Sequence, residues 1–279
     1  MGTGTYLMSR RRALKGLALA AVPSVLAASE ERACDLRNQD MAFQVVMSKG
    51  KIVSRRLFNK LVDETIDLPL DDFALAFDKG IVLTPSRMSL DGATQNEDQI
   101  KLLFSSSVPN VEVRVEYHLA RGKSYLRKQI AVRHRKPTGL KLVRADLDNW
   151  RGVRRHWESM RADPMRCGSH PIFCETLWAG VEFVAAFNEY DRDGFILRSR
   201  PGGRPLGPEW LELHSTVVGV AKPNEARESF LQHYIDDIRQ TRPRLVACYN
   251  TWWSLPEIFK ADELMPLIRG IKEGLRRVV

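Results

Sequence analysis

Between residues 42 and 221, apolar and polar side chains alternate with the period of two that is typical of β-strands. The clearest run is residues 111–119, where one face carries Val111, Val113, Val115, Tyr117 and Leu119. Charged side chains and a histidine occupy the other face of that run. A second alternating set follows the turn at residues 120–124 and comprises Leu126, Lys128, Ile130, Val132 and His134. The two runs predict a β-hairpin.

Short turn sequences separate the other predicted strands. Ser48-Lys-Gly-Lys lies between residues 44–47 and 52–58, and Asp78-Lys-Gly lies between residues 73–77 and 81–84, so each predicts a hairpin. Further strands are expected at residues 140–150, 181–188, 195–199 and 212–221. Turn signals recur about every 8–12 residues without a helical period, which indicates an all-β sandwich. We therefore predict a mostly β protein with a large antiparallel β-sandwich of two sheets over residues 42–222.

After residue 222 the pattern changes to that of helices. Asn224 is the expected N-cap of a linking helix within residues 223–243, whose apolar stripe includes Phe230 and Tyr234. A short apolar strand at residues 245–249 and a second amphipathic helix at residues 262–278 follow. Pro266 is expected in or near the first turn of that helix, where proline is tolerated.

A strand, a loop and a helix in this order form the unit from which a (β/α)₈ barrel is built. Residues 244–279 are therefore interpreted as the first βα unit of an incomplete, truncated barrel. A parallel strand needs neighbours on both sides. The sequence leaves three alternatives for this strand: it pairs with the sandwich, a partner chain completes it, or it forms an exposed edge.

The first thirty residues have the features of an export signal. Residues 9–15 follow the twin-arginine pattern Ser-Arg-Arg-x-Phe-Leu-Lys, with Arg10 and Arg11 as the paired arginines and Ala13 as the departure. The apolar stretch 16–28 is shorter than the ~20 residues of a membrane span and ends in small residues that suit signal peptidase. We predict a signal peptide over residues 1–28, export in folded form to the periplasm or beyond, and no stable membrane insertion after cleavage. The alternative interpretation is a buried N-terminal helix.

Charge gives little support for a nucleic-acid partner. The formal net charge of +9 includes four cations of the predicted signal, so about +5 remains on the rest of the chain. A basic run around Trp150 and Trp157 comprises Arg151, Arg154, Arg155, Arg161 and Arg166. We interpret it as a solvated sheet edge or loop, and expect no nucleic acid as a partner.

Two of the four cysteines are a candidate local disulfide. Cys167 and Cys174 lie seven residues apart, and an oxidising compartment permits a bridge between them. With His170 they resemble a metal-ligand spacing, but a fourth ligand is not evident, so we predict neither a metal nor a cofactor. Cys248 lies within the predicted strand and is expected to be a buried thiol.

Candidate chemistry centres on carboxylates and on one aromatic segment. Glycoside hydrolysis needs two carboxylates that flank the scissile bond. Candidates by composition are Glu175, Glu182, Glu189, Asp191 and Asp193, of which Glu175 and Glu182 flank an expected turn at Trp178. Spacing pairs none of them, and a solvated or structural role is the alternative for each. Trp252 and Trp253 beside Asn250 are the stronger candidates, because aromatic faces and an amide suit a sugar; packing between sandwich and barrel is the alternative.

Several segments together resemble bacterial α-galactosidase-like (melibiase) glycoside hydrolases. Residues 173–183, 194–197, 200–202, 217–221, 225–230 and 234–239 occur in the order seen in that family, and Tyr249-Asn-Thr-Trp-Trp253 is the most specific element. The resemblance covers residues 42–279 and implies an N-terminal β-supersandwich before a catalytic (β/α)₈ barrel. It implies that Trp252 lies beside a galactosyl pocket, with Asn250 and Trp253 near it, and that the partner is an α-galactoside-like carbohydrate.

The departure from that family concerns catalysis. Its members resemble one another in using a nucleophilic aspartate and an acid/base aspartate from later barrel strands, and neither has a counterpart in this sequence. We therefore predict an exported carbohydrate-active protein without α-galactosidase activity of its own. A separately encoded barrel fragment is a possible partner, and the complete enzyme would hydrolyse a terminal α-glycosidic bond with retention. The alternative is a non-catalytic carbohydrate-binding or assembly β-sandwich module, and a third class is an all-β surface protein without sugar contact.

Overall fold

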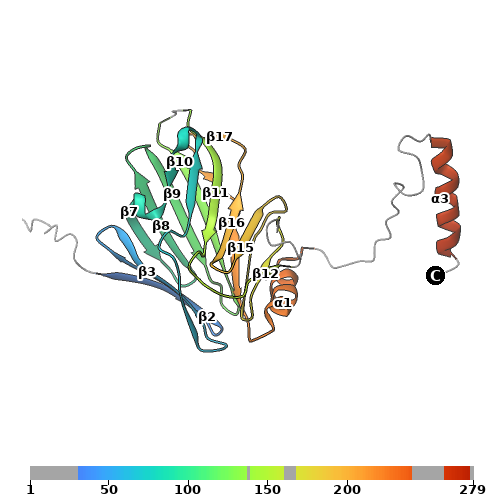
Figure 1. The fold of residues 1–279 in the computed structure, drawn as a ribbon, viewed down its shortest axis with the longest axis horizontal. Helices are drawn as coiled ribbons and strands as arrows, with labels where there is room; N and C mark the ends of the chain where they lie inside the picture. The colour runs from blue at the N-terminus through green and yellow to red at the C-terminus, as the bar shows by residue number, and fades with distance from the viewer. Residues whose placement is uncertain (1–30, 137–138, 160–167, 241–260, 277–279) are drawn as a thin grey trace, which may run out of the picture. The chain divides into compact units, whose positions relative to one another are not determined.

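The computed structural model describes residues 31–136, 139–159, 168–240 and 261–276, and its described part is mostly β-strand. It divides into two compact units, residues 1–237 and 238–279. The first unit contains three antiparallel sheets, and the second contains helix α3 (Ala261–Arg276) (Figure 1). The predicted fold class, a large antiparallel β-sandwich followed by a helix, is confirmed. The predicted strand of the barrel unit, residues 245–249 with Cys248, lies outside the described residues.

The largest sheet has nine strands, and eight of them follow one path. Its order is β12 (Glu158–Ser159), β13 (Ile172–Phe173), β14 (Leu177–Val181), β19 (Thr216–Val220), β10 (Tyr125–His134), β9 (Val111–His118), β8 (Gln99–Ser106) and β7 (Ser89–Gln95). Strand β18 (Leu211–Glu212) pairs with β10 beside this path. Strand β7 ends the path with a register shift between Leu90 and Gly92, and five of its seven residues are exposed and the other two half-buried.

Two smaller sheets complete the sandwich. The four-stranded sheet has the order β1 (Arg32–Arg37), β2 (Met41–Ser48), β3 (Lys51–Asn59) and β4 (Glu64–Asp67). The six-stranded sheet has the order β15 (Phe187–Asp191), β16 (Gly194–Ser199), β11 (Lys141–Asn149), β5 (Ala74–Phe77) and β6 (Val82–Leu83), with β17 (Arg204–Pro205) paired to β11. Short 3₁₀ turns η1 (Asp78–Gly80) and η2 (Pro85–Arg87) flank β6. The described residues therefore form three sheets where the alternating pattern predicted two.

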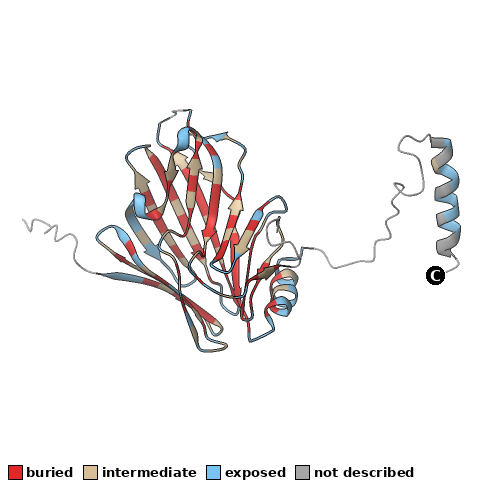
Figure 2. Ribbon diagram, viewed as in Figure 1, coloured by how far each residue is buried: buried red, intermediate tan, exposed pale blue. Residues whose placement is uncertain are grey.

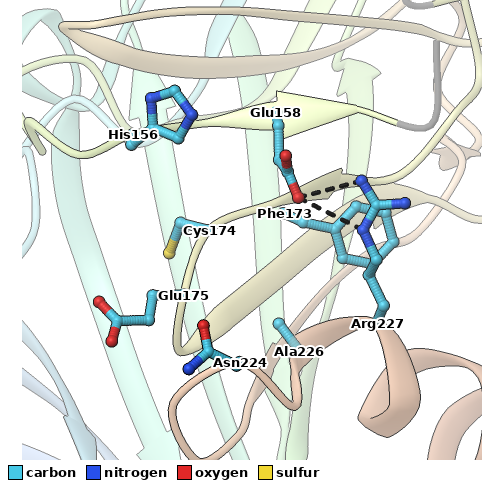
Figure 3. Close-up of a pocket in the computed structure, with 8 residues that line it drawn as sticks. All are labelled: His156, Glu158, Phe173, Cys174, Glu175, Asn224, Ala226 and Arg227. Atoms are coloured by element: carbon cyan, nitrogen blue, oxygen red, sulfur yellow. Dashed lines mark hydrogen bonds and ion pairs between the residues drawn. The ribbon is translucent and has the colours of Figure 1, made fainter.

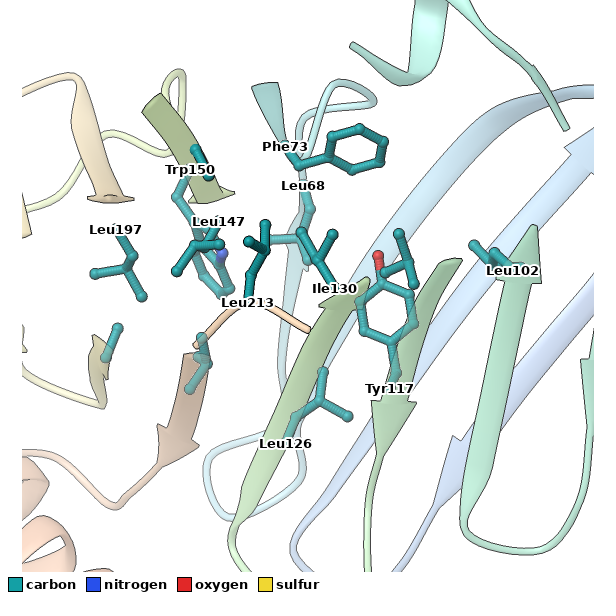
Figure 4. Close-up of a cluster of buried hydrophobic side chains, with 14 of the residues drawn as sticks. Leu68, Phe73, Leu102, Tyr117, Leu126, Ile130, Leu147, Trp150, Leu197 and Leu213 are labelled. Atoms are coloured by element: carbon teal, nitrogen blue, oxygen red, sulfur yellow. The ribbon is translucent and has the colours of Figure 1, made fainter. Parts of the chain in front are cut away.

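One hydrophobic core receives side chains from all three sheets. Buried residues recur along the strands of the sandwich (Figure 2), and Figure 4 shows part of the core, with Tyr117 and Ile130 of the nine-stranded sheet and Leu147 and Leu197 of the six-stranded sheet. The predicted inward face of β9, from Val111 to Tyr117, is at most 1% exposed, and the hairpin of β9 with β10 is confirmed. The predicted hairpin turn between β2 and β3 is also confirmed, because Lys49 and Gly50 both adopt positive φ there. Alternation of apolar residues thus places the core correctly in these strands.

Two of the predicted strands are wrong in their extent. Residues 181–188 contain the end of β14 and the start of β15, with a turn between them in which the Phe183 N–H donates to the Val181 carbonyl. Residues 212–221 are divided between β18 and β19. The expected turn at Trp178 is instead the middle of strand β14, paired with Gly219 of β19.

The linking helix consists of α1 (Ala226–Glu228), the π-helical segment η3 (Ser229–Ile235) and α2 (Asp236–Ile238). Asn224 is not its N-cap: that position is Glu225, while Asn224 has φ of 66° and donates its N–H to the Glu175 carbonyl. Asparagine tolerates this left-handed conformation better than most residues. In α3, Pro266 is the sixth residue and lies in the second turn, where its missing N–H leaves the Asp262 carbonyl without its usual donor.

Candidate functional site

The residues that the sequence singles out for sugar binding lie outside the described part of the chain. Asn250, Trp252 and Trp253 fall within residues 241–260, and the paired Arg10 and Arg11 fall within residues 1–30. Their roles stay predictions. The described residues that precede segment 241–260 form the linking helix, the sheet beneath it and a cavity beside it.

The linking helix packs on the nine-stranded sheet through a cluster of aromatic side chains. Trp178 of β14 is fully buried, and its ring centroid lies 5.2 Å from that of Phe230 and 4.9 Å from that of Tyr234. Tyr125 of β10 packs edge-on against Tyr234 at 5.1 Å. Aromatic pairs at these separations stabilise a contact beyond their area burial. The Trp178 indole N–H also donates to the Ser229 hydroxyl at 3.1 Å, so the helix is held in one position on the sheet.

Charged groups hold both ends of this contact. The Arg127 guanidinium makes three hydrogen-bond contacts with the Glu182 carboxylate, at 2.7–3.0 Å. The Tyr234 hydroxyl donates to the same carboxylate at 2.6 Å. Burial and this hydrogen bond raise the pKa of Tyr234. At the other end, Asp237 accepts hydrogen bonds from the Lys123 ammonium and the Tyr125 hydroxyl, which lower its pKa. Six side chains therefore fix where the chain leaves the sandwich.

The candidate carboxylates are each neutralised by a cation, with one exception. Glu182 is bound by Arg127. Three further pairs are Glu189 with Arg198, Asp191 with Arg151, and Asp193 with Arg154. Ion pairs of this kind favour a structural role over that of a proton donor. Glu175 is the exception, since it lines a cavity beside the helix.

That cavity has a volume of about 410 Å³, and both polar and apolar side chains line it (Figure 3). Glu158 of β12 accepts two hydrogen bonds from the Arg227 guanidinium of α1, at 3.0 and 3.3 Å, and this guanidinium lies 5.2 Å from the Phe173 ring centroid. The remaining lining residues are His156, Cys174, Glu175, Asn224 and Ala226. Carboxylate, guanidinium and amide groups together can exchange hydrogen bonds with a small hydroxylated molecule.

Sequence reasoning missed three of the lining residues, His156, Glu158 and Arg227. Arg227 lies in residues 225–230, one of the segments on which the family resemblance rests. Its contact with Glu158, 69 positions earlier, leaves no pattern in the sequence near either residue. Cys174 is buried, which raises its pKa, and it has no disulfide partner among the described residues. Cys167 lies outside them, so a bridge between the two stays a prediction.

The basic run around Trp150 and Trp157 is tied into the sandwich where it is described. Both tryptophans are buried, and Arg155 pairs with Glu64 at 2.6 Å. Within the described ranges, no three His, Cys, Asp or Glu side chains are grouped closely enough to hold a metal ion. None of the described helices is long and apolar enough to cross a membrane.

Comparison with known proteins returns three results. No protein-family model and no curated protein matches the chain. Among solved structures, it is similar to the GH36 α-galactosidase AgaA from Geobacillus stearothermophilus (TM-score 0.43, 8% identity, 69% of this chain and 41% of that one). It is likewise similar to AgaB of the same organism (TM-score 0.44, 8% identity, 72% and 41%). The chain thus spans about two fifths of the length of these enzymes, and a likeness of this degree does not identify its family.

Proposed function

We propose that the chain is the carbohydrate-binding front part of a glycoside hydrolase-type protein that recognises α-galactoside-like sugars. In this proposal the sandwich is a scaffold, and the segment after the linking helix contacts the sugar through Trp252, with Asn250 and Trp253 beside it. Bond cleavage belongs to a barrel that supplies two carboxylates. The twin-arginine pattern at Arg10 and Arg11 supports export to the periplasm or beyond as part of the same proposal.

The order of the elements carries the proposal. An antiparallel sandwich is followed by a helix that aromatic and charged side chains fix on its largest sheet, and the chain then continues to Tyr249-Asn-Thr-Trp-Trp253. A helix held in this way gives the following segment a defined starting point at Asp237.

The chemistry of the segment suits a sugar. Indole rings offer flat apolar faces for the C–H face of a pyranose, and an amide such as that of Asn250 both donates to and accepts from hydroxyl groups. Two adjacent tryptophans and an asparagine within four residues combine both kinds of contact. This combination favours carbohydrate over a charged or purely apolar ligand.

Titration calorimetry on the full chain tests the proposal. We expect methyl α-D-galactoside and raffinose to bind, and Trp252→Ala to weaken that binding at least about tenfold, which corresponds to about 1.4 kcal/mol. Trp210→Ala is the matched control, because Trp210 lies on the sandwich between the Arg114 and Arg133 guanidinium groups, 4.8 and 4.4 Å from its ring centroid. Its affinity should equal that of the unchanged chain.

Two results would count against the proposal. If neither sugar binds the folded chain, the sandwich is a module without sugar contact. If both tryptophan variants lose affinity equally, the loss reflects general destabilisation, and the segment 249–253 is not the binding element.

A further inference from the structure

Four charged side chains lie together in the interior of the sandwich. Arg55 of β3, Asp72, Lys128 of β10 and Asp148 of β11 are between 1% and 4% exposed. The Lys128 ammonium lies 2.8 Å from Asp72 Oδ2 and 3.6 Å from Asp148 Oδ1, and Arg55 lies 3.2 Å from Asp72 Oδ2. The group connects all three sheets, since β3, β10 and β11 belong to different ones.

This arrangement is costly as a set of four charges. The free-energy cost of removing ions from water is offset only when each ion is paired and hydrogen-bonded. Two atoms of this group have no hydrogen-bond partner: Asp72 Oδ1 and Arg55 Nε. Two cations and two anions balance in charge. If one lysine–aspartate pair were converted to a neutral group, the Arg55–Asp72 pair would remain and the balance would be kept. Conversion of Lys128 and Asp148 to a neutral group is the change that leaves the Arg55–Asp72 pair in place.

We propose that the Lys128 amine and the Asp148 side-chain carboxyl condense to an isopeptide bond between β10 and β11, with the release of one water molecule. In this reaction a bond forms between Lys128 Nζ and Asp148 Cγ, and one Cγ–O bond of Asp148 breaks. Lys128 loses its positive charge and Asp148 its acidic group. Oxidant, reductant and cofactor are not needed, because the step is a condensation.

Asp72 is placed to move the proton. The lysine ammonium must first lose a proton, and the Asp72 carboxylate is its nearest acceptor, at 2.8 Å. Burial opposes the charged form of Asp72, but Arg55 and Lys128 outweigh it and lower its pKa, so this group is available as the base. Asp72 Oδ1 has no hydrogen-bond partner, so it can accept the proton that Lys128 loses. Asp72 then passes this proton to the Asp148 carboxylate, and after the attack the second proton that Lys128 Nζ loses joins the hydroxyl group that leaves Asp148 as water.

Asp148 has the properties of the electrophile. Burial raises its pKa above the ordinary value against the opposing influence of Lys128 and Arg55, and a protonated carboxyl is attacked more readily than a carboxylate. The Trp150 indole N–H donates to Asp148 Oδ1 at 3.1 Å, and the Thr216 hydroxyl donates to Oδ2 at 3.2 Å. These donors polarise the carboxyl and stabilise the negative charge that develops on its oxygen during attack. The Lys128 nitrogen lies 3.6 Å from Oδ1, an oxygen bonded to the carbon that it attacks.

The surroundings exclude water. Ile130 and Leu147 are close in sequence to Lys128 and Asp148 and lie in the buried cluster of Figure 4, each 1% exposed. Tyr117 is also 1% exposed, and its hydroxyl donates to Asp72. Loss of water from a dry site favours the amide over its hydrolysis. The product links the nine-stranded sheet covalently to the six-stranded sheet.

Intact-mass measurement of the purified, denatured full chain tests the proposal. We expect a mass about 18 Da below that calculated from the sequence, the loss of one water. Trypsin should release a branched peptide in which residues 128–133 are joined to residues 145–151, because a linked Lys128 is not cleaved. Fragmentation of that peptide should place the link at Asp148, with Asp146 as the internal control, since Asp146 pairs with Arg198 instead.

Variants separate the roles. Lys128→Arg keeps the charge and should show the full calculated mass, and Asp72→Asn should do the same or react more slowly. Asp148→Asn should lose ammonia, about 17 Da, in place of water. A folded, unchanged chain that keeps its full mass after prolonged incubation overturns the proposal, and a link at Asp72 or Asp146 overturns the assignment to Asp148. The mass of the unchanged chain decides the matter even if the variants do not fold.

Discussion

Substitution of Gly219 by alanine tests how tightly the linking helix and the sheet are packed. Gly219 lies in β19 directly opposite Trp178 of β14. A Cβ atom at this position would lie 2.0 Å from Trp178 Cε2 and 2.2 Å from Cζ2. Such separations are far inside van der Waals contact, so either the indole or the strand must move.

Neither movement is easy. Trp178 is fully buried, its indole N–H is bonded to Ser229, and the rings of Phe230 and Tyr234 pack against it. Strand β19 is paired on both sides, with β14 and β10, so a shift would disturb two ladders. Overpacking of a dense core costs about 1–3 kcal/mol, and the rigid surroundings here place Gly219→Ala at the upper end, about 3 kcal/mol. For a domain of this size that corresponds to a fall in Tm of about 6–12 °C.

Thermal and urea unfolding, followed by circular dichroism, measure the effect. Gly92→Ala is the control: Gly92 also lies in a strand of the nine-stranded sheet, and a Cβ there meets nothing within 4 Å. The control should unfold within about 0.5 kcal/mol of the unchanged chain. Equal midpoints for the two variants would refute the reasoning, because they would show that Trp178 is free to move away from β19.

Three further predictions concern the polar contacts of the linking helix. Hydrogen bonds from Lys123 and Tyr125 lower the pKa of Asp237. Its contribution to stability is therefore present above the unfolded pKa of about 4 and is lost as the pH falls through the folded pKa. Asp237→Asn should make the free energy of unfolding less dependent on pH over that acid range, as measured by urea unfolding at a series of pH values. Burial and Asp237 raise the pKa of Tyr125 to about 12, so its contribution is full below about pH 10 and is lost as the pH rises from there to about 12. Tyr125→Phe should reduce this alkaline loss, and an unchanged alkaline profile would count against the assignment. Tyr234→Phe removes one donor to Glu182 but leaves Arg127 in place, so it should cost about 1 kcal/mol in the same unfolding assay, and a cost near zero would mean that the hydroxyl is solvated.

The sequence predicts the strands best where a local feature determines them. The turn at Lys49 and Gly50 requires positive φ and appears as expected, and the alternation in β9 and β10 identifies their buried faces. The prediction of one strand over residues 181–188 is wrong because no local feature marks the turn within it. Val181 and Phe187 suggest one apolar strand, but Glu182 pairs with Arg127 and the chain turns after it. Pairing between distant segments leaves no local pattern, which is why three sheets were not distinguished from two.

For the buried charged group and the candidate carboxylates, too, the sequence predicts local features but not contacts between distant segments. Period two placed Lys128 on the inward face of its strand with Leu126 and Ile130, but its partners Asp72 and Asp148 come from other segments of the chain. The ion pairs that neutralise the candidate carboxylates also join different segments of the chain, so spacing does not reveal them. The proposed role of Trp252, by contrast, is based on the sequence alone, because Trp252 lies outside the described residues.

Strand β7 has a consequence for how the protein behaves in concentrated solution. Its outer edge carries exposed polar side chains, and the register shift between Leu90 and Gly92 interrupts the regular spacing of backbone donors and acceptors. A strand from another molecule would find few of its hydrogen bonds in register along this edge. Growth of the sheet from one molecule to the next, the first step toward fibres, is therefore blocked at β7.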